Sequence, residues 1–302
     1  MNNVYFLLDA CTVINLIHLE DTDFLLRRID KLSIRVIDVV YQEIRNNVSS
    51  FIRTKESLRL ITRKEVRELT LETDQKVKFF RKYIYESSKL KDELGGDYIN
   101  LIKSKTGYGK RENGELYSVA LALYLNRNQS SMLVFYTDDY PAKEDFVDFF
   151  EFQQIGQIKD SIDLLLLLCS SSENFNLQQL DNYLSALSSI YTIEVTLLKG
   201  ELRKLYNRKF SAKSLKKNKE QFEKMNQLIQ QLDKLEFAGI NSIKEYFNRK
   251  KKDLAKDINR IINAHLLPFE LEGKEDLNLI AKIKATRKRL ESESVLSLLD
   301  LC

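Results

Sequence analysis

The sequence predicts an α/β fold with a parallel sheet flanked by helices, followed by a mainly α-helical C-terminal domain. In the first half of the chain, short apolar runs rich in β-branched and aromatic residues alternate with helical patterns. These runs lack the polar alternation of half-exposed strands, as is typical of strands buried on both faces of a parallel sheet. Beyond residue 177 almost no strand pattern remains. The whole chain contains only nine Gly and two Pro residues, which favours long helices.

The expected elements of the first half follow in order. Strands are expected at residues 4–8, 34–40 and 132–137. A helical pattern comes directly after the first strand, and the second runs into the helical stretch YQEIRNN. Residues 51–105 show a charged helical pattern without clear boundaries. The stretch ELYSVALALYL, residues 115–125, is expected to form a compact helix because its apolar residues recur at i, i+3 and i+4.

The second half is expected to be helical. We interpret SSSENFN, residues 170–176, as a linker between a domain of residues 1–170 and a helical domain of residues 177–302. Only the stretch IYTIEVTLL, residues 190–198, keeps an ambiguous strand pattern. Residues 215–260 are polar and helical with a break near Gly239, which predicts an antiparallel helical hairpin.

The formal net charge of +4 is unevenly distributed along the chain. Residues 199–260 contain 18 Lys or Arg and 8 Asp or Glu, a balance of +10. A basic helical segment is typical of contact with a polyanion such as nucleic acid, although a solvated or partner-binding hairpin has the same composition. The candidate nucleic-acid-binding residues are a cluster in this segment and two cations of the stretch GYGKR: Arg249, Lys250, Lys251, Lys252, Lys110 and Arg111.

Cysteine content and hydropathy indicate a cytoplasmic protein without membrane contact. The three cysteines, Cys11, Cys169 and Cys302, are odd in number and widely spaced, so neither a disulfide framework nor a zinc-finger pattern is visible. No signal-peptide pattern opens the sequence. The longest apolar run, Leu164–Cys169, is too short to span a bilayer.

Several acidic residues stand at expected strand ends or helix starts. Ligands of parallel α/β sheets bind outside the carboxyl ends of the strands, where these residues would meet. Carboxylates without His or Cys suit Mg²⁺ or Mn²⁺ rather than zinc, and such a site can hydrolyse a phosphodiester. Helix capping and macrodipole contacts explain the same positions without any metal. The candidates are Asp9, Glu43, Glu115, Asp138 and Asp139.

The chain resembles the PIN-domain nucleases in four acidic motifs that occur in the family's order: FLLDACTVINL, VIDVVYQEI, NGELYSVALA and LVFYTDDYPAKEDF. The resemblance covers roughly the first half of the chain. It implies a Rossmann-like α/β/α domain, an acidic pocket that binds Mg²⁺ or Mn²⁺, and hydrolysis of RNA, most often by the toxin of a toxin–antitoxin pair.

Matched residue by residue, the first three motif acids correspond to Asp9, Glu43 and Glu115. The family's Thr-x-Asp pattern selects Asp139 as the fourth, with Asp138 as a further candidate ligand. Cys11 departs from the pattern, because the family commonly has a small polar residue two positions after the first Asp. The helical second half has no counterpart in the minimal family.

The expected function is therefore that of a Mg²⁺- or Mn²⁺-dependent endoribonuclease, acting as a toxin or defence effector. The helical domain would bind RNA, an antitoxin or other protein, or a second copy of the chain. The alternative is a non-catalytic scaffold in which the helical half is the working part. A deoxyribonuclease with the same chemistry is equally compatible with the sequence, since no motif announces contacts to a 2′-hydroxyl.

Overall fold

The structure is a computed structural model that describes residues 4–108, 112–171, 176–209, 211–234, 240–250, 253–265 and 279–292. These residues form two compact units that divide after Leu180. The first unit is an α/β domain, and the second consists of helices among its described residues.

The α/β unit is built on a five-stranded sheet in the order β3-β2-β1-β4-β5, and every strand pair is parallel. The parallel sheet that the sequence predicted is thus confirmed. The strands are β1 (Val4–Leu8), β2 (Ile34–Ile37), β3 (Ile84–Tyr85), β4 (Met132–Tyr136) and β5 (Gly156–Lys159). The chain adds β2 and β3 on one side of β1 and then returns to add β4 and β5 on the other side.

The second strand is shorter than predicted, because residues 38–40 belong to the following helix. The Asp38 carboxylate accepts hydrogen bonds from the Val39 N–H at 2.8 Å and from the Ser87 N–H at 3.1 Å, which fixes the helix start. Neither edge strand, β3 nor β5, was predicted from the sequence. Gly156, with φ of +155°, allows β5 to approach β4, since a Cβ there would lie 1.8 Å from the Leu133 carbonyl oxygen.

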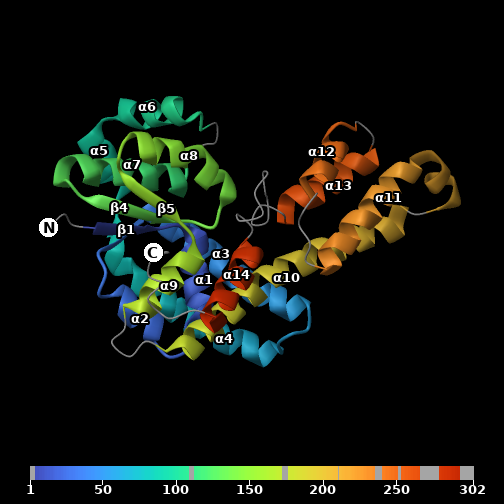
Figure 1. The fold of residues 1–302 in the computed structure, drawn as a ribbon, viewed down its shortest axis with the longest axis horizontal. Helices are drawn as coiled ribbons and strands as arrows, with labels where there is room; N and C mark the ends of the chain where they lie inside the picture. The colour runs from blue at the N-terminus through green and yellow to red at the C-terminus, as the bar shows by residue number, and fades with distance from the viewer. Residues whose placement is uncertain are drawn as a thin grey trace. The chain divides into compact units, whose positions relative to one another are not determined.

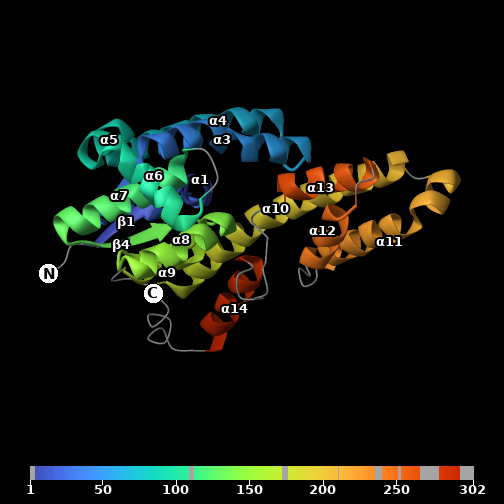
Figure 2. The same ribbon diagram turned by 90° about the horizontal axis from the view of Figure 1, so that it is seen from above.

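Helices cover both faces of the sheet, with α7 and α8 on one side and α1 and α9 on the other (Figure 1). The helices are α1 (Ala10–Leu19), α2 (Phe24–Ile29), α3 (Asp38–Ser57), α4 (Arg63–Phe79), a 3-10 turn η1 (Phe80–Tyr83), α5 (Ser87–Leu94), α6 (Gly96–Thr106), α7 (Gly114–Gln129), α8 (Tyr140–Phe152) and α9 (Ser161–Ser170). Residues 114–123 of α7 are all buried, because this helix packs between the sheet and α3, α5 and α6. Figure 2 shows α3 and α4 as an antiparallel pair.

The second unit contains α11 (Ala212–Lys234), α12 (Ile240–Asn248), α13 (Asp253–His265), α14 (Leu279–Ser292) and, from Asp181 onward, α10 (Leu177–Lys209). The ambiguous stretch 190–198 lies inside α10, where Tyr191, Val195 and Leu198 are buried at helical spacing. In the segment predicted to form an antiparallel hairpin, α11 packs against α12 and α13. Its predicted break near Gly239 lies outside the described residues.

The apolar face of α11 is buried inside this unit. Phe222, Met225, Leu228 and Leu232 are each at most 1% exposed, and the Phe222 ring packs edge-on against Tyr206 of α10. Among the described helices, none combines the length and the apolar character needed to cross a bilayer.

Candidate active site at the carboxyl ends of the strands

Asp9 lies at the point where the direction of strand addition reverses. It follows β1, whose last residue pairs with Tyr136 of β4, and the Asp9 N–H donates to the Tyr136 carbonyl at 3.0 Å. Asp9 is 4% exposed, and its carboxylate accepts a hydrogen bond from the Thr137 hydroxyl at 2.9 Å. Asp9 occupies the N-cap position of α1, but its side chain makes no capping hydrogen bond. The alternative of a purely structural cap therefore lacks the bond that would define it.

Glu115 is held by side chains that surround the start of α7. The Tyr108 hydroxyl lies 2.6 Å from Glu115 Oε2, and the Asn113 amide donates to the same oxygen at 3.1 Å. Asn113 also caps α7, because its Oδ1 accepts from the Leu116 N–H at 3.2 Å. The Tyr108 ring packs on Phe146, with ring centroids 4.9 Å apart. Glu115 is 9% exposed, so this surrounding restricts its orientation.

Glu43 reaches the start of α7 from the second turn of α3. Its Oε1 accepts from the Gly114 N–H at 3.4 Å. A side chain at position 114 would not fit, since a Cβ there would lie 2.5 Å from Val40 Cγ2 and 3.1 Å from Glu43 Oε2. Gly114 therefore lets the half-buried Glu43 approach the helix terminus where Glu115 begins.

Electrostatic repulsion connects these three carboxylates. Burial raises the pKa of Asp9 from 3.8 to about 6, and the negative charge of Glu115 contributes to this rise. The pKa of Glu43 is raised by burial and, to a smaller extent, by the same Glu115 charge. Glu115 is thus common to both repulsions, because its charge raises the pKa of Asp9 and the pKa of Glu43.

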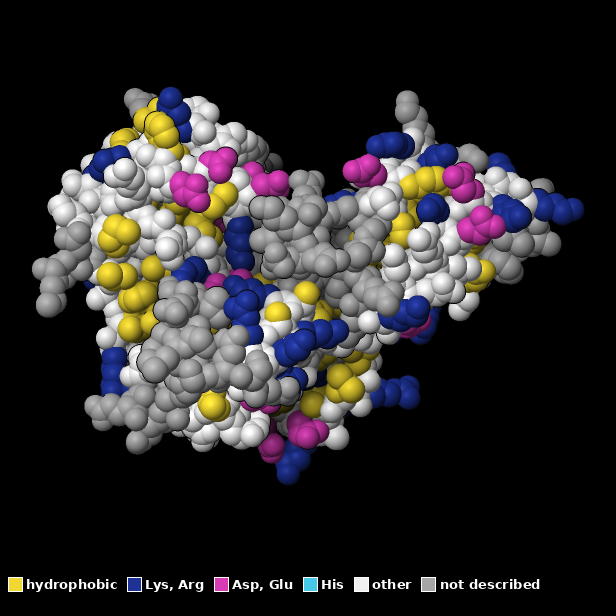
Figure 3. All heavy atoms as spheres, viewed as in Figure 1, with side chains coloured by type: hydrophobic (Ala, Val, Ile, Leu, Met, Phe, Trp, Pro, Cys, Tyr) yellow, Lys and Arg dark blue, Asp and Glu magenta, His cyan; other side chains and the backbone are white. Residues whose placement is uncertain are grey.

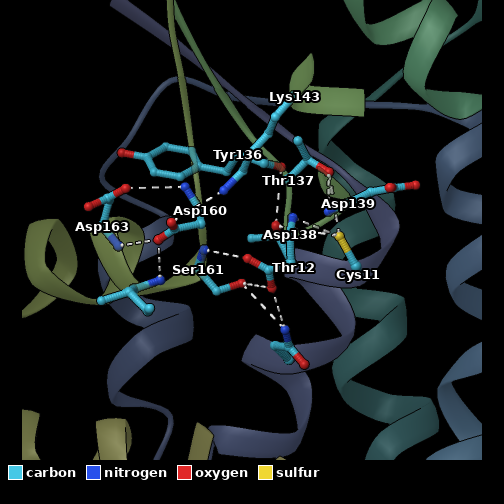
Figure 4. A network of polar contacts seen from close by, with 12 residues as sticks. Cys11, Thr12, Tyr136, Thr137, Asp138, Asp139, Lys143, Asp160, Ser161 and Asp163 are labelled. Carbon is cyan, nitrogen blue, oxygen red and sulfur yellow. Dashed lines mark hydrogen bonds and ion pairs between the residues drawn. The ribbon is translucent and has the colours of Figure 1, made fainter. Parts of the chain in front are cut away.

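Asp138 is bound into the framework of the domain (Figure 4). Its Oδ2 accepts from the Ser161 hydroxyl at 2.6 Å and from the Asn15 amide at 2.7 Å, and its Oδ1 accepts from the Ser161 N–H at 2.8 Å. The carboxylate therefore joins α1 to the start of α9. Asp160 caps α9 through the N–H groups of residues 162 and 163 and forms an ion pair with Lys143 at 3.3 Å.

Asp139 directly precedes α8, and its carboxylate points away from the Asp138–Ser161 contact in Figure 4. It sits at the N-cap position of α8 without a side-chain capping bond, so the capping alternative lacks its defining contact here too. The Asp139 N–H donates to the Thr137 hydroxyl oxygen at 3.1 Å. Because Thr137 donates in turn to Asp9, one hydroxyl links the first and fourth acidic motifs.

Cys11 lies beside this link. Its thiol donates to Asp9 Oδ2 at 3.2 Å, and its sulfur accepts from the Asp138 N–H at 3.2 Å. Burial and the nearby charges of Asp9 and Asp138 raise the pKa of the Cys11 thiol, so the neutral thiol is favoured and acts as a hydrogen-bond donor.

A preformed metal-ligand cluster is not seen in the described residues, where no group of three or more His, Cys, Asp or Glu is arranged to hold an ion. The chemistry of the donor set nevertheless fits a hard divalent cation, because carboxylate oxygens that repel one another gain from a positive charge between them. Mg²⁺ commonly uses only one or two carboxylates, with waters and substrate phosphate completing its coordination.

The candidate nucleic-acid contacts are only partly described. Lys110, Arg111, Lys251 and Lys252 lie outside the described residues. Arg249 and Lys250 belong to the second unit, and both pair with acids. Arg249 Nη2 lies 2.9 Å from Glu245 Oε2, and Lys250 Nζ lies 3.8 Å from Glu220 Oε2.

Sequence reasoning did not single out Thr137, Tyr108, Asn113 and Gly114 as contributors to the site. Thr137 belongs to the Thr-x-Asp pattern, and Asn113-Gly114 directly precede Glu115, so the third and fourth motifs contained a signal for these residues. Tyr108 had no such signal, because it contributes through a tertiary contact of its hydroxyl with Glu115. No family model, curated protein or solved structure matches the chain.

Proposed function

We propose that the α/β unit is a Mg²⁺- or Mn²⁺-dependent endoribonuclease with a PIN-like active site formed by Asp9, Glu43, Glu115 and Asp139. The observation that carries the proposal is the buried Asp9 at the reversal point of a parallel sheet, where its charge is opposed by burial and by Glu115. Ligand sites of open parallel sheets lie at this point. A strongly perturbed carboxylate in such a position is a marker of functional sites.

The residues have separable roles in this proposal. Asp9 and Glu115 would hold the cation, with Asp139 as a further oxygen donor. Thr137 and Cys11 orient the Asp9 carboxylate through its Oδ2. When bound, the cation neutralises charge on the scissile phosphate and lowers the pKa of an attacking water.

Three positioning residues act on the other acids of the site. Tyr108 and Asn113 orient Glu115, and Gly114 makes room for Glu43. Rigid placement of the acids matters because displacement of a positioned group by about 1 Å can cost about a hundredfold in rate.

The same proposal takes RNA as the substrate and gives the protein a role as a toxin or defence effector. An antitoxin or other protein would bind the helical unit. The four acidic motifs support this part of the proposal. The competing proposal is a non-catalytic scaffold. The repulsion of Asp9 and of Glu43 by Glu115 favours the catalytic alternative, because it raises the free energy of the metal-free fold.

The test is cleavage of end-labelled RNA and DNA of matched sequence, with Mn²⁺, Mg²⁺ or EDTA. The purified chain should cleave RNA only with a divalent cation, and Asp9→Asn should reduce the rate by at least about a hundredfold. Asp74→Asn is the matched control, because Asp74 is an exposed residue of α4 and the charge change is the same. Equal metal-dependent cleavage by Asp9→Asn would remove Asp9 from the mechanism, and no cleavage under any condition would favour the scaffold.

A further inference from the structure

The outer part of the antiparallel α3–α4 pair carries an excess of positive charge. Residues 45–71, all of which are described, contain seven Lys or Arg and three Glu, a balance of +4. By contrast, the remaining part of α4, residues 72–79, contains two basic and two acidic residues. In Figure 3, Lys or Arg side chains project from the end where α3 meets α4. The positive charge is therefore concentrated in this part of the pair.

The acids of this segment do not neutralise its arginines. Glu65 belongs to the capping box of α4, because its Oε2 accepts from the Thr62 N–H at 2.7 Å. Glu68 Oε1 pairs with Lys64 Nζ at 3.8 Å. Four exposed arginines of the segment form no ion pair with any residue that the structure describes, and the third acid, Glu56, is no exception. We name these arginines the α3–α4 basic end: Arg53, Arg59, Arg63 and Arg67.

Helix stability does not account for the two arginines of α4. Arg63 and Arg67 are one helical turn apart, and like charges at this spacing destabilise a helix. The neighbouring positions of the same helix have the favourable arrangement, since Lys64 and Glu68 are four residues apart and of opposite charge. The Arg63–Arg67 spacing therefore needs an explanation outside the helix itself.

Backbone conformation likewise does not account for Arg59. This residue follows the end of α3 with φ of +58°, in the left-handed region that favours glycine. Its N–H donates to the Glu56 carbonyl at 2.9 Å, and the Leu60 N–H donates to the Lys55 carbonyl at 2.9 Å, so the helix ends in the motif where glycine is most common. An arginine at this position costs stability, and its long cationic side chain is what a glycine would not supply.

The basic end and the candidate active site share one helix. Glu43 lies in the second turn of α3, and Arg53 lies ten residues further along the same continuous helix. This spacing corresponds to about 15 Å along the helix axis. Successive phosphates lie about 3.4 Å apart along one strand of a duplex, so about five nucleotides suffice to cover the distance. A strand held at the site can therefore reach the basic end.

We propose that the α3–α4 basic end binds the phosphate backbone of the nucleic-acid strand that flanks the scissile bond. The inference rests on the proposed function in taking nucleic acid as the polyanion. Charge complementarity selects this occupant, because guanidinium groups without acidic partners match the phosphate oxygens in charge and in paired hydrogen-bond geometry. Two leucines of this end, Leu60 and Leu71, are 60% and 67% exposed, but single exposed apolar side chains are common and do not by themselves select a protein partner.

The test measures binding in the Asp9→Asn background with EDTA, so that cleavage does not interfere. Fluorescence anisotropy on a 20-nucleotide RNA and the DNA of the same sequence compares the parent with a variant in which the four arginines of the basic end are replaced by Gln. A second variant has Lys at the same four positions and keeps the charge. The matched control replaces four exposed cations elsewhere in the α/β unit by Gln: Arg27, Lys31, Lys78 and Arg81. Circular dichroism and thermal melting establish that all variants fold.

Each lost phosphate contact lowers the salt slope of single-strand binding by about 0.7. Four lost contacts should lower the slope by about 3, so that parental affinity falls about 50-fold more than that of the Gln variant over a fourfold rise in salt. The Lys variant and the control should keep the parental slope. Equal slopes for parent and Gln variant, or equal losses in the Gln variant and the control, would overturn the proposal. Binding of poly-L-glutamate without binding of either nucleic acid would identify an acidic protein partner and overturn it as well.

These outcomes separate the two proposals. If the wild-type chain cleaves RNA with Mn²⁺ but the Gln variant keeps the parental slope, the nuclease stands and the basic end fails. If the basic end carries binding but the wild-type chain never cleaves with any metal, the surface stands and the nuclease fails. Equal slope changes on RNA and DNA would support backbone contacts common to both, and a change on RNA alone would identify RNA as the bound strand.

Discussion

The charge of Asp9 should lower the stability of the metal-free protein, and Asp9→Asn should relieve this cost. The folded state binds the Asp9 proton more tightly than the unfolded chain does, because the pKa is raised from 3.8 to about 6. The resulting stabilisation is fully present below about pH 4 and is lost as the pH rises through about 6. Above pH 7 the folded protein therefore carries the whole cost of a buried, repelled carboxylate.

The rise in pKa sets the size of the effect. It corresponds to about 3 kcal/mol between the acid and neutral limits. Asparagine can still accept the hydrogen bond that the Thr137 hydroxyl donates to Asp9. Its side-chain NH2 group, however, needs an acceptor that the carboxylate did not need, and a buried donor without one lowers the stability. We therefore expect Asp9→Asn to stabilise the metal-free protein at pH 8 by about 1–3 kcal/mol, with the advantage disappearing near pH 4.

The measurement is thermal or urea unfolding of wild type, Asp9→Asn and the Asp74→Asn control between pH 4 and 8 in EDTA. A stabilisation of 1 kcal/mol should raise Tm by about 2–4 °C for a domain of this size. Added Mn²⁺ should reduce or cancel this difference, because an ion that binds only the folded state at 100 times its Kd stabilises it by about 2.7 kcal/mol. Asp9→Asn would lack much of this gain.

Two results would refute the reasoning. If Asp9→Asn lowered the stability equally at pH 4 and pH 8, Asp9 would be a structural hydrogen-bonding residue whose ionisation does not matter. If Mn²⁺ stabilised wild type and Asp9→Asn equally, the ion would bind elsewhere. The Asp74→Asn control should follow wild type throughout, which shows that the response is specific to the buried position.

Three further predictions concern positioning and binding. Gly114→Ala should destabilise the domain by about 1–3 kcal/mol and lower cleavage, because its Cβ would lie 2.5 Å from Val40 Cγ2; unfolding and rate measurements check this, and a neutral result would contradict the close approach. Tyr108→Phe should leave the fold intact but reduce kcat and shift its pH profile, since Glu115 loses a hydroxyl donor at 2.6 Å; an unchanged pH profile would exclude this positioning role. Replacing residues 249–252 with Gln should weaken RNA binding and flatten its salt slope if the basic hairpin contacts phosphate, and an unchanged slope would identify it as a solvated or partner-binding surface.

Much of the α/β architecture could be predicted from local patterns. The strands at 4–8 and 132–136 are apolar runs long enough to be recognised, and α7 shows helical spacing along its length. The predicted strand at 4–8 also placed Asp9, because the carboxyl end of a buried parallel strand lies at the edge of the sheet where ligands bind. These features depend on residues close together in the chain, so their signal is contained in short segments.

The edge strands and the details of the site depended on tertiary contacts. The strand β3 has two residues and β5 is the polar stretch GQIK, so neither has an apolar run of its own. The sequence could not show that Asp138 binds Asn15, 123 positions away, rather than facing the candidate site. Likewise, the Gly114 N–H donates to the carboxylate of Glu43, which lies 71 positions away in the chain.

The cations of the second unit show the same contrast between what the sequence predicts and what tertiary packing determines. The charge count along the sequence identified residues 199–260 as the basic segment. In the structure, Arg249 of this segment pairs with Glu245 and Lys250 pairs with Glu220. Composition determined that the second half of the chain is basic and helical. Only tertiary structure decided which cations face solvent together, because packing of the apolar residues sets the rotation of each helix and the distances between charges from different helices.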